Sequence, residues 1–255
     1  FIGGIMNLTI DKYWQNRAKT YDDGVQEEID HGHKDDWTKL FSAYLPEDLT
    51  DKKVLDLGCG PGLFSLLMAE KGATVTAFDK SEKMLEMAKK NLKAFEGKVT
   101  FVKGDCEEVS FENESFDYIL SRNLTWMLSF PSTTYKLWKS YLKKGGKLII
   151  VDAGWYSYVW CENYSKLAAK NLKEGINSGY DMRVSFEEAD QCENLAKDMP
   201  MTYVKRPDFD LAILNKIGFE SIEIKKNIDP LVYDESFQIA YRSSPSFIIV
   251  AKKGG

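Results

Sequence analysis

The stretch Lys53-Val-Leu-Asp-Leu-Gly-Cys-Gly-Pro-Gly62 decides how the rest of the chain is interpreted. Its apolar run, Val54 to Leu57, suits a strand that is buried on both faces of a parallel sheet. Glycines follow at alternate positions, where the backbone can turn tightly and a ligand can approach it without meeting a Cβ atom. Residues 63–71 have the pattern of a helix that ends at Gly72. Strand, glycine loop and helix together are the opening unit of a nucleotide-binding α/β domain.

The spacing of these glycines indicates which ligand binds. A dinucleotide motif, G-x-G-x-x-G, has its third glycine three residues after the second, whereas Gly62 follows Gly60 by two and Asp56 precedes Gly58 by two. The pattern Asp56-x-Gly58-x-Gly60-x-Gly62 resembles motif I of the class I S-adenosylmethionine (SAM)-dependent methyltransferases. The resemblance implies that the acid and the three glycines belong to a SAM site. The alternative is a tight strand-to-helix turn that binds nothing.

Composition and charge limit the possible functions. The chain has 255 residues, of which 44% are hydrophobic, enough for one α/β domain with an insertion. Its 34 basic and 39 acidic residues give a net charge of −5, and without a polybasic block we expect no nucleic-acid partner. The apolar runs are too short for a bilayer, and no secretory leader is visible before or after Met6. The four cysteines form no C-x-x-C pair. These features favour a cytoplasmic protein without membrane association or a metal site.

The segment that precedes the glycine loop carries a second signature. Tyr13, Arg17 and Tyr21 are spaced four apart, on one face of a predicted helix. The segment resembles the YW-x-x-RA-x-x-YD sequence that precedes motif I in many small-molecule methyltransferases. The resemblance implies that this helix closes over the cofactor and that Tyr13 and Arg17 reach the methionine carboxylate of SAM. The alternative is an ordinary amphipathic helix with an exposed arginine.

An acid ends the second predicted strand, residues 74–79. Asp79 lies 23 residues after Asp56, close to the interval at which Rossmann-type folds place a ribose-binding carboxylate. A carboxylate suits this role because it accepts two hydrogen bonds from a vicinal diol. We also assign Lys80 and Met84 to the cofactor site.

The third and fourth predicted strands, 99–103 and 116–120, complete the cofactor site that the resemblance implies. Asp105 would accept from the adenine amine and the backbone N–H of Cys106 would meet a ring nitrogen, while Ser121 and Arg122 would hold the methionine ammonium through the backbone. The sequence Ser121-Arg-Asn-Leu124 departs from the Asp/Asn-Pro-Pro-aromatic sequence of DNA-amine and glutamine-amide methyltransferases. Those two acceptor classes are therefore not expected.

Further strands are predicted at 148–152, 221–225 and 247–251, with helices at 135–141 and 209–219. The expected fold is α/β: a Rossmann-like, seven-stranded, mostly parallel sheet with helices on both faces and a helical lid insertion after strand 5. The expected parts are an N-terminal helical segment over the cofactor site (1–49), the SAM-binding core (50–153), the lid or substrate insertion (154–207) and the C-terminal part of the sheet (208–255).

The insertion is rich in aromatic residues and contains two helical patterns. Ser185-x-x-Glu188 is a capping box that predicts where the second helix begins. Small-molecule methyltransferases commonly place a lid here, which implies an acceptor site enclosed by Trp126, Trp155, Tyr156 and Trp160. The alternative is that these aromatic side chains form the insertion's own core.

The resemblance implies a SAM-dependent methyltransferase (EC 2.1.1 type) that acts on N, O or S of a small molecule and releases S-adenosylhomocysteine (SAH). His31, His33 and Tyr13 are the candidate catalytic bases, although His31-Gly-His33 has the pattern of a solvated loop. Two alternatives remain open: a catalytically silent SAM/SAH-binding or assembly subunit, and an enzyme that uses SAM for other chemistry. We expect a monomer or homodimer.

Overall fold

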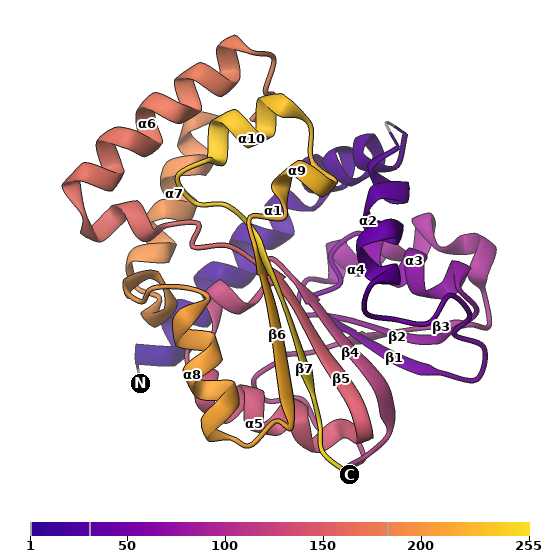
Figure 1. The fold of residues 1–255 in the computed structure, drawn as a ribbon. Helices are drawn as coiled ribbons and strands as arrows, with labels where there is room; N and C mark the ends of the chain where they lie inside the picture. Colours follow the sequence, from indigo (N-terminus) through magenta and orange to yellow (C-terminus); the bar gives the residue numbers. More distant parts are fainter. Residues whose placement is uncertain (1, 31, 183) are drawn as a thin grey trace.

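The computed structural model describes residues 2–30, 32–182 and 184–255, and the side chains of residues 2–9 lie outside that description. Its centre is a seven-stranded sheet with the order β3-β2-β1-β4-β5-β7-β6 (Figure 1). The strands are β1 (Lys53–Leu57), β2 (Thr74–Asp79), β3 (Val99–Lys103), β4 (Phe116–Arg122), β5 (Leu142–Asp152), β6 (Ser221–Lys226) and β7 (Phe247–Lys252). Only the pairings of β7, with β5 and with β6, are antiparallel within the described residues. The predicted mostly parallel α/β sheet is confirmed.

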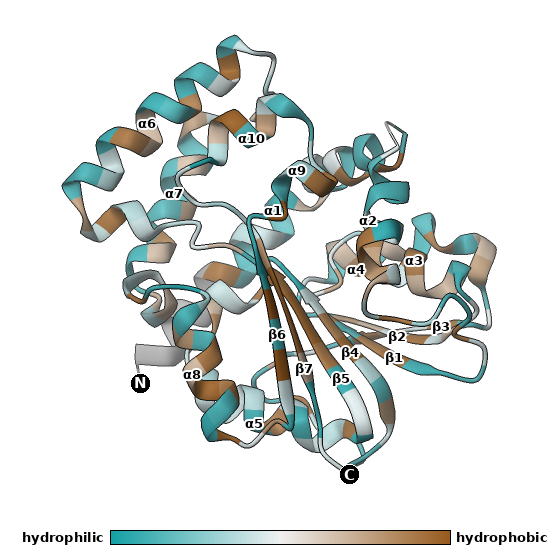
Figure 2. Cartoon of the chain, viewed as in Figure 1, coloured by the Kyte–Doolittle hydropathy of each residue, from teal (hydrophilic) through white to brown (hydrophobic). Residues whose placement is uncertain are grey.

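The central strands are apolar because helices cover both faces of the sheet (Figure 2). Val54 of β1 and Ile149 of β5 pack into one core with α2 (His33–Ser42) and α3 (Leu63–Glu70). Their neighbours Leu55 and Ile150 point the other way, into a core with α5 (Pro131–Tyr141) and α8 (Asp208–Lys216). Successive side chains of a strand point to opposite faces, so a strand between two helical layers is apolar throughout.

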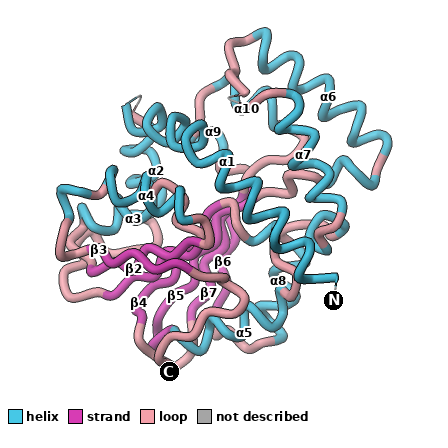
Figure 3. The backbone as a smooth tube through the Cα atoms, turned by 180° about the vertical axis from the view of Figure 1, so that it is seen from behind, coloured by secondary structure: helices cyan, strands magenta, loops and turns pink. Residues whose placement is uncertain are grey.

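The N-terminal helix is much longer than the predicted segment around Tyr13. The helix α1 spans Ile2–Asp30 and packs against α2, α7 (Phe186–Lys197) and α4 (Glu82–Asn91). Seen from behind, α1 crosses between the end of the sheet and α7 (Figure 3). Gly32, at φ 84°, is the N-cap of α2, so His33 begins a helix. The expected solvated loop at His33 is therefore wrong, whereas His31 lies outside the described residues.

The strand β5 begins six residues earlier than the predicted start at Leu148. Residues 142–147 belong to the strand as well, with Gly145 at φ 74° and a register shift between Phe116 and Tyr118 of β4. A Cβ atom on Gly146 would lie 2.8 Å from the Asp117 carbonyl oxygen. The two glycines thus let β5 run close to β4 through an irregular pairing.

Three helices form a cap beyond the carboxyl ends of the parallel strands (Figure 1). Two of them, α6 (Glu162–Asn177) and α7, come from the predicted insertion, and the capping box at Ser185 is confirmed. The third, α10 (Glu235–Tyr241), follows α9 (Asp229–Val232) in the connection between β6 and β7, where sequence analysis predicted no helix. It packs on α6 so closely that a Cβ atom on Gly175 would lie 2.5 Å from the Ala240 Cβ. Two separate segments thus build the cap.

Short 3₁₀ segments complete the chain: η1 (Lys93–Phe95), η2 (Thr125–Met127), η3 (Ser157–Trp160) and η4 (Pro200–Tyr203). None of the described helices has the length and apolar character of a membrane span.

Candidate active site

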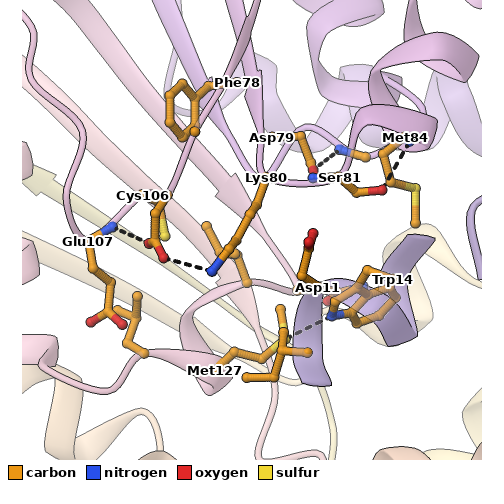
Figure 4. Close-up of a pocket in the computed structure, with 18 of the residues that line it drawn as sticks. Asp11, Trp14, Phe78, Asp79, Lys80, Ser81, Met84, Cys106, Glu107 and Met127 are labelled. Atoms are coloured by element: carbon orange, nitrogen blue, oxygen red, sulfur yellow. Dashed lines mark hydrogen bonds and ion pairs between the residues drawn. The ribbon is translucent and has the colours of Figure 1, made fainter. Parts of the chain in front are cut away.

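A cavity lies at the carboxyl ends of β1, β2, β3 and β4, where open α/β sheets bind ligands. We call it the cofactor cavity (Figure 4). The predicted cofactor residues in its walls are Gly58, Gly60, Asp79, Lys80, Met84, Asp105, Cys106 and Arg122. The helix α1 supplies a further wall with Ile10, Asp11, Trp14 and Tyr21.

The three glycines of the loop all have positive φ, at 66°, 53° and 93°, but their surroundings differ. Gly60 faces the cofactor cavity, and a Cβ atom there would meet only Tyr21, at 3.6 Å. Gly62 lies outside the cavity wall, and its Cβ would lie 2.7 Å from the Leu92 side chain. Gly60 therefore leaves room for a ligand, whereas Gly62 lets α3 pack against the end of α4.

Asp79 ties the end of β2 to the glycine loop. Its Oδ2 accepts the Gly60 N–H at 2.9 Å and its Oδ1 accepts the Ser81 N–H at 2.8 Å. Burial raises the pKa of Asp79 to about 6, and the nearby Asp11 charge also raises this pKa. Each carboxylate oxygen keeps a second acceptor position. These two backbone donors fix the orientation of the carboxylate, and its ribose role stays a prediction.

Asp105 and Glu107 order the loop that follows β3. Asp105 Oδ2 accepts from Lys80 Nζ at 3.0 Å across the cavity wall, and its Oδ1 accepts the Glu107 N–H at 2.9 Å. Glu107, which sequence analysis missed, accepts the N–H groups of Ser129 and Phe130 at 3.0 and 2.8 Å. Burial raises the pKa of the Cys106 thiol well above its usual range, so the thiol is neutral. The adenine role of this loop stays a prediction.

Two further predicted cofactor residues, Asp56 and Ser121, also lie outside the cavity wall. Asp56 is buried within β1, where its Oδ2 accepts from Ser65 Oγ at 2.6 Å, and burial raises its pKa to about 6. Ser121 is buried near the end of β4. Both side chains support the strands that carry the cavity, and direct contact with a cofactor stays a prediction.

A second, larger cavity of about 750 Å³ lies between α1, the end of β4 and the cap. We call it the cap cavity. Three of the predicted acceptor-site residues, Trp126, Trp155 and Tyr156, line it. The fourth, Trp160, lies outside its wall, with 49% of its surface exposed and its ring next to Tyr164.

The two cavities meet at a shared wall of four residues, Trp14, Tyr21, Arg122 and Asn123. Asn123 Nδ2 donates to Tyr21 Oη at 3.4 Å, and the ring of Trp14 meets that of Tyr21 edge-on, with centroids 5.7 Å apart. Sequence analysis did not assign Trp14 or Asn123. Their signal was local: Trp14 is seven residues before Tyr21, on the same face of α1, and Asn123 directly follows β4.

The side chain of Arg122 is held by partners from other elements. Its Nη2 donates to the Glu28 carboxylate at 2.7 Å and to Tyr233 Oη at 3.1 Å. The guanidinium lies over the Trp37 ring, 4.8 Å from the centroid, and Trp37 Nε1 donates to Glu28 at 3.1 Å. The Arg122–Glu28 ion pair therefore joins β4 to α1 at the shared wall. Sequence analysis expected only backbone contacts at Arg122.

Tyr13 and Arg17 line the cap cavity and lie outside the wall of the cofactor cavity. Burial is the main reason why the pKa of Tyr13 rises well above its usual range, and Cys192 beside it adds to this effect, so the phenol is neutral. Arg17 donates to Thr20, one turn further along α1. The helix is thus rotated so that Trp14, rather than Arg17, faces the cofactor cavity. Contact with the methionine carboxylate stays a prediction.

His33 lines the cap cavity, with its Nδ1 3.6 Å from Asp36 Oδ2. Its catalytic role stays a prediction. Among the described residues, no group of three or more His, Cys, Asp or Glu side chains is arranged to hold a metal ion.

Two tryptophans of the cap cavity are fixed by one buried acid, Asp152. Trp155 Nε1 donates to its Oδ1 at 2.8 Å, and the Trp126 N–H donates to its Oδ2 at 3.0 Å. Arg206, at the return from the cap, pairs with the same carboxylate and with Asp210. The end of β5 therefore sets the position of both aromatic walls.

Comparison with known proteins agrees with this geometry. A family model described as a methyltransferase domain matches residues 54–146. The malonyl-(acyl-carrier protein) O-methyltransferase of Priestia megaterium is 29% identical over 245 residues, which cover 92% of this chain and 85% of that protein. The ubiquinone biosynthesis O-methyltransferase of Coxiella burnetii is 33% identical over 107 residues, 41% of this chain and 46% of that protein.

The fold also matches phosphoethanolamine N-methyltransferase 2 of Haemonchus contortus, solved with phosphomonomethylethanolamine and S-adenosylhomocysteine. The TM-score is 0.59 at 18% identity, over 87% of this chain and 53% of that one. This likeness shows a shared architecture, and the matched family domain covers β1 to the start of β5, which carry the cofactor cavity. Residues 54–146 therefore match a methyltransferase domain, and the chain has the Rossmann-like fold of solved SAM-dependent methyltransferases.

Proposed function

We propose that this methyltransferase transfers the sulfonium methyl group of SAM, held in the cofactor cavity, to a nucleophilic N, O or S atom of a small molecule in the cap cavity. The observation that carries the proposal is the shared wall. Trp14, Tyr21, Arg122 and Asn123 line both cavities, so a ligand in each would meet at one place.

The cofactor cavity suits SAM in the chemistry of its walls. Asp79 offers a fixed carboxylate for the ribose, and the loop at 104–107 borders the place for adenine. Gly60 allows close approach at the end of β1, towards the methionine part, whereas a Cβ atom on Gly58 would lie 2.9 Å from the Leu124 side chain. These positions follow the order of the strands in the sheet, which is β3, β2, β1 and β4.

SAM supplies an activated methyl group, so the protein's main tasks are alignment and the exclusion of water. Holding two reacting groups in line contributes about 7–11 kcal/mol to lowering a bimolecular barrier. Trp126, Trp155 and Tyr156 enclose the cap cavity beside the shared wall. Their π faces favour a nearby cation by about 0.5–2 kcal/mol each.

The acceptor that fits the cap cavity has a flat apolar or aromatic body. Aromatic side chains from the end of β5, the cap and the connection after β6 line this space, including Trp155, Tyr180, Tyr233, Phe237 and Tyr241. The names of the two relatives, both O-methyltransferases, favour oxygen as the nucleophile. One relative is named as a methyltransferase of malonyl-(acyl-carrier protein), so the alternative to a free small molecule is an acceptor bound to a carrier protein.

His33 is the residue we propose as the base for an acceptor that must lose a proton. Histidine is the side chain whose ordinary pKa lies nearest neutrality, and His33 lines the cap cavity. Tyr13 lines it too, but burial keeps its phenol protonated. An amine or thiolate acceptor that is already nucleophilic would need no base.

The proposal is tested by incubating the protein with SAM carrying a tritiated methyl group and with a cell extract that has been separated into small-molecule and protein fractions. We expect label in a small-molecule fraction and SAH in equal amount. Label in a protein fraction would point to the carrier-bound alternative. SAH without a labelled product would indicate other SAM chemistry, and SAM binding without SAH formation in any fraction would indicate a silent subunit. The Asp79→Ala variant is the matched control, since it should abolish transfer at low SAM concentrations.

A further inference from the structure

Asp11, on α1, has an acceptor atom for which the protein provides no donor. Its side chain lines the cofactor cavity, and its Oδ1 is buried without a hydrogen-bond partner in the described part of the chain. A buried carboxylate oxygen without a donor is unfavourable, so such an atom in a cavity wall indicates a ligand that donates to it. Sequence analysis gave this residue no role.

The surroundings of Asp11 indicate which part of a ligand it meets. The carboxylate points from α1 into the space beside Lys80 and Ser81, opposite Asp79 (Figure 4). The charges of Asp11 and Asp79 influence one another, since Asp11 contributes to the raised pKa of Asp79. Nearby cations have other partners: Lys80 pairs with Asp105 at 3.0 Å and Lys103 with Glu82 at 2.9 Å.

The donors and acceptors on each part of SAM indicate which part Asp11 contacts. Both oxygens of Asp79 already accept one backbone N–H each, from Gly60 and Ser81. A ribose offers two hydroxyl protons, and Asp79 could take both only by accepting a second bond at each oxygen. Asp11 lies across the same part of the cavity with an oxygen that accepts nothing. The adenine end and the methionine end have other polar groups, Asp105 and Asn123.

We propose that Asp11 accepts a hydrogen bond from one hydroxyl of the SAM ribose and shares the diol with Asp79. The proposal rests on the proposed function, because it takes the cofactor cavity as the SAM site. Two carboxylates on opposite walls then hold the ribose between the sheet and α1. The ribose thereby ties α1, which also carries Trp14 and Tyr21 of the shared wall, to the nucleotide-binding core.

The test compares Asp11→Ala with Asp23→Ala in calorimetric titrations with SAH, adenosine, 2′-deoxyadenosine and 3′-deoxyadenosine. Asp23 is the matched control because it lies on the same helix, with its side chain 54% exposed and paired with Lys19. A hydrogen bond to a charged group corresponds to about 10- to 100-fold in affinity. We expect Asp11→Ala to weaken SAH and adenosine by the same factor in this range, and Asp23→Ala to change neither.

The deoxynucleosides give the second, independent readout. One of the two lacks the hydroxyl that Asp11 contacts, so the wild type and Asp11→Ala should bind this nucleoside equally well. The other keeps that hydroxyl, so Asp11→Ala should bind it more weakly than the wild type by the same factor as adenosine. Asp11→Asn, which keeps an acceptor oxygen but no charge, should give a smaller loss than Asp11→Ala.

Three outcomes would overturn the proposal. One is unchanged SAH and adenosine binding by Asp11→Ala. Another is a loss of equal size for both deoxynucleosides and adenosine, which would separate Asp11 from the hydroxyls. The third is a loss for SAH but not for adenosine, which would place Asp11 at the sulfur or the amino-acid part. If the wild type fails to bind SAH, the proposed function fails as well, and that result is distinct from the other three.

Discussion

The guanidinium of Arg206 lies 3.1 Å from the Asp152 carboxylate, and neither side chain has any exposed surface. Asp210 is the second partner of Arg206, at 2.9 Å, and Tyr135 Oη donates to Asp210 at 2.6 Å. The Arg206–Asp152 pair joins the end of β5, where the chain leaves the sheet, to the start of α8, where the chain returns. This buried ionic cluster, directly behind Trp126 and Trp155, therefore anchors the part of the cap that contains α6 and α7 to the sheet.

Asp152→Ala should lower the free energy of unfolding by about 3–5 kcal/mol, because it leaves Arg206 buried with one partner fewer. The variant also deprives Trp155 Nε1 and the Trp126 N–H of their acceptor. Urea denaturation measures the change. Glu162→Ala is the control, since its pair with Lys166 is 80% and 74% exposed and should contribute no more than about 1 kcal/mol. A loss for Asp152→Ala as small as that of the control would contradict the anchoring role.

Asp79→Ala should weaken SAM and SAH binding by about 10- to 100-fold, since hydrogen bonds to charged groups contribute about 1.5–3 kcal/mol. The variant also frees the Gly60 N–H, which Asp79 holds at 2.9 Å. Calorimetry on protein whose fold is confirmed by circular dichroism provides the measurement. Unchanged affinity would remove Asp79 from the ribose site.

SAH affinity should depend on pH through the ionisation of Asp79. Burial raises the pKa of this carboxyl to about 6, so below that pH the cofactor-free protein carries it mainly protonated and without the charge that attracts hydroxyl donors. Affinity should be constant well above pH 6 and fall by up to about tenfold per pH unit below it, until the loss reaches that of Asp79→Ala. Titrations on both sides of this pH measure the slope.

The source of that slope can be checked with two variants. Asp79→Asn should bind SAH weakly but without the pH dependence. Asp56→Asn should keep the slope, because Asp56 has a similar pKa of about 6 but lies outside the cavity wall. The account is wrong about Asp79 if Asp79→Asn retains the slope and Asp56→Asn loses it.

The cap should be less protected from hydrogen exchange than the sheet. Its helices α6 and α10 pack mainly on one another, whereas β1 and β5 are buried between two helical layers. Amides of α6, α7 and α10 should exchange faster than those of β5 in the cofactor-free protein and slow down when SAH or an acceptor binds. Equal protection with and without ligand would make the cap a fixed structural part instead of a lid.

The sequence predicted the sheet and the cofactor loop well for local physical reasons. The bounds of β2 and β3 agree with their predicted ranges, because short apolar runs end there at Asp79 and Lys103. Gly58 and Gly60 lie in the cofactor cavity because positive φ is needed where β1 turns into α3. These signals require no knowledge of distant contacts.

The remaining site residues depend on packing between distant segments. The face that α1 turns to the cofactor is set by its contacts with α2, α4 and α7, so the periodicity of Tyr13, Arg17 and Tyr21 could not reveal that Trp14 lines the cofactor cavity and Arg17 does not. Glu28 meets Arg122 across 94 residues. The helix α10 has only seven residues, too few for a clear periodic pattern, and its position follows from Ala240 packing on Gly175.

The most direct test of the account is the ratio of SAH formed to methylated acceptor formed, measured by mass spectrometry in one reaction once an acceptor fraction is known. The account predicts one SAH for each methylated small molecule, with both products falling together in Asp79→Ala and unchanged in Asp23→Ala. SAH in excess of the methylated product, or a product that forms equally well in Asp79→Ala, would contradict methyl transfer from the cofactor cavity to the cap cavity.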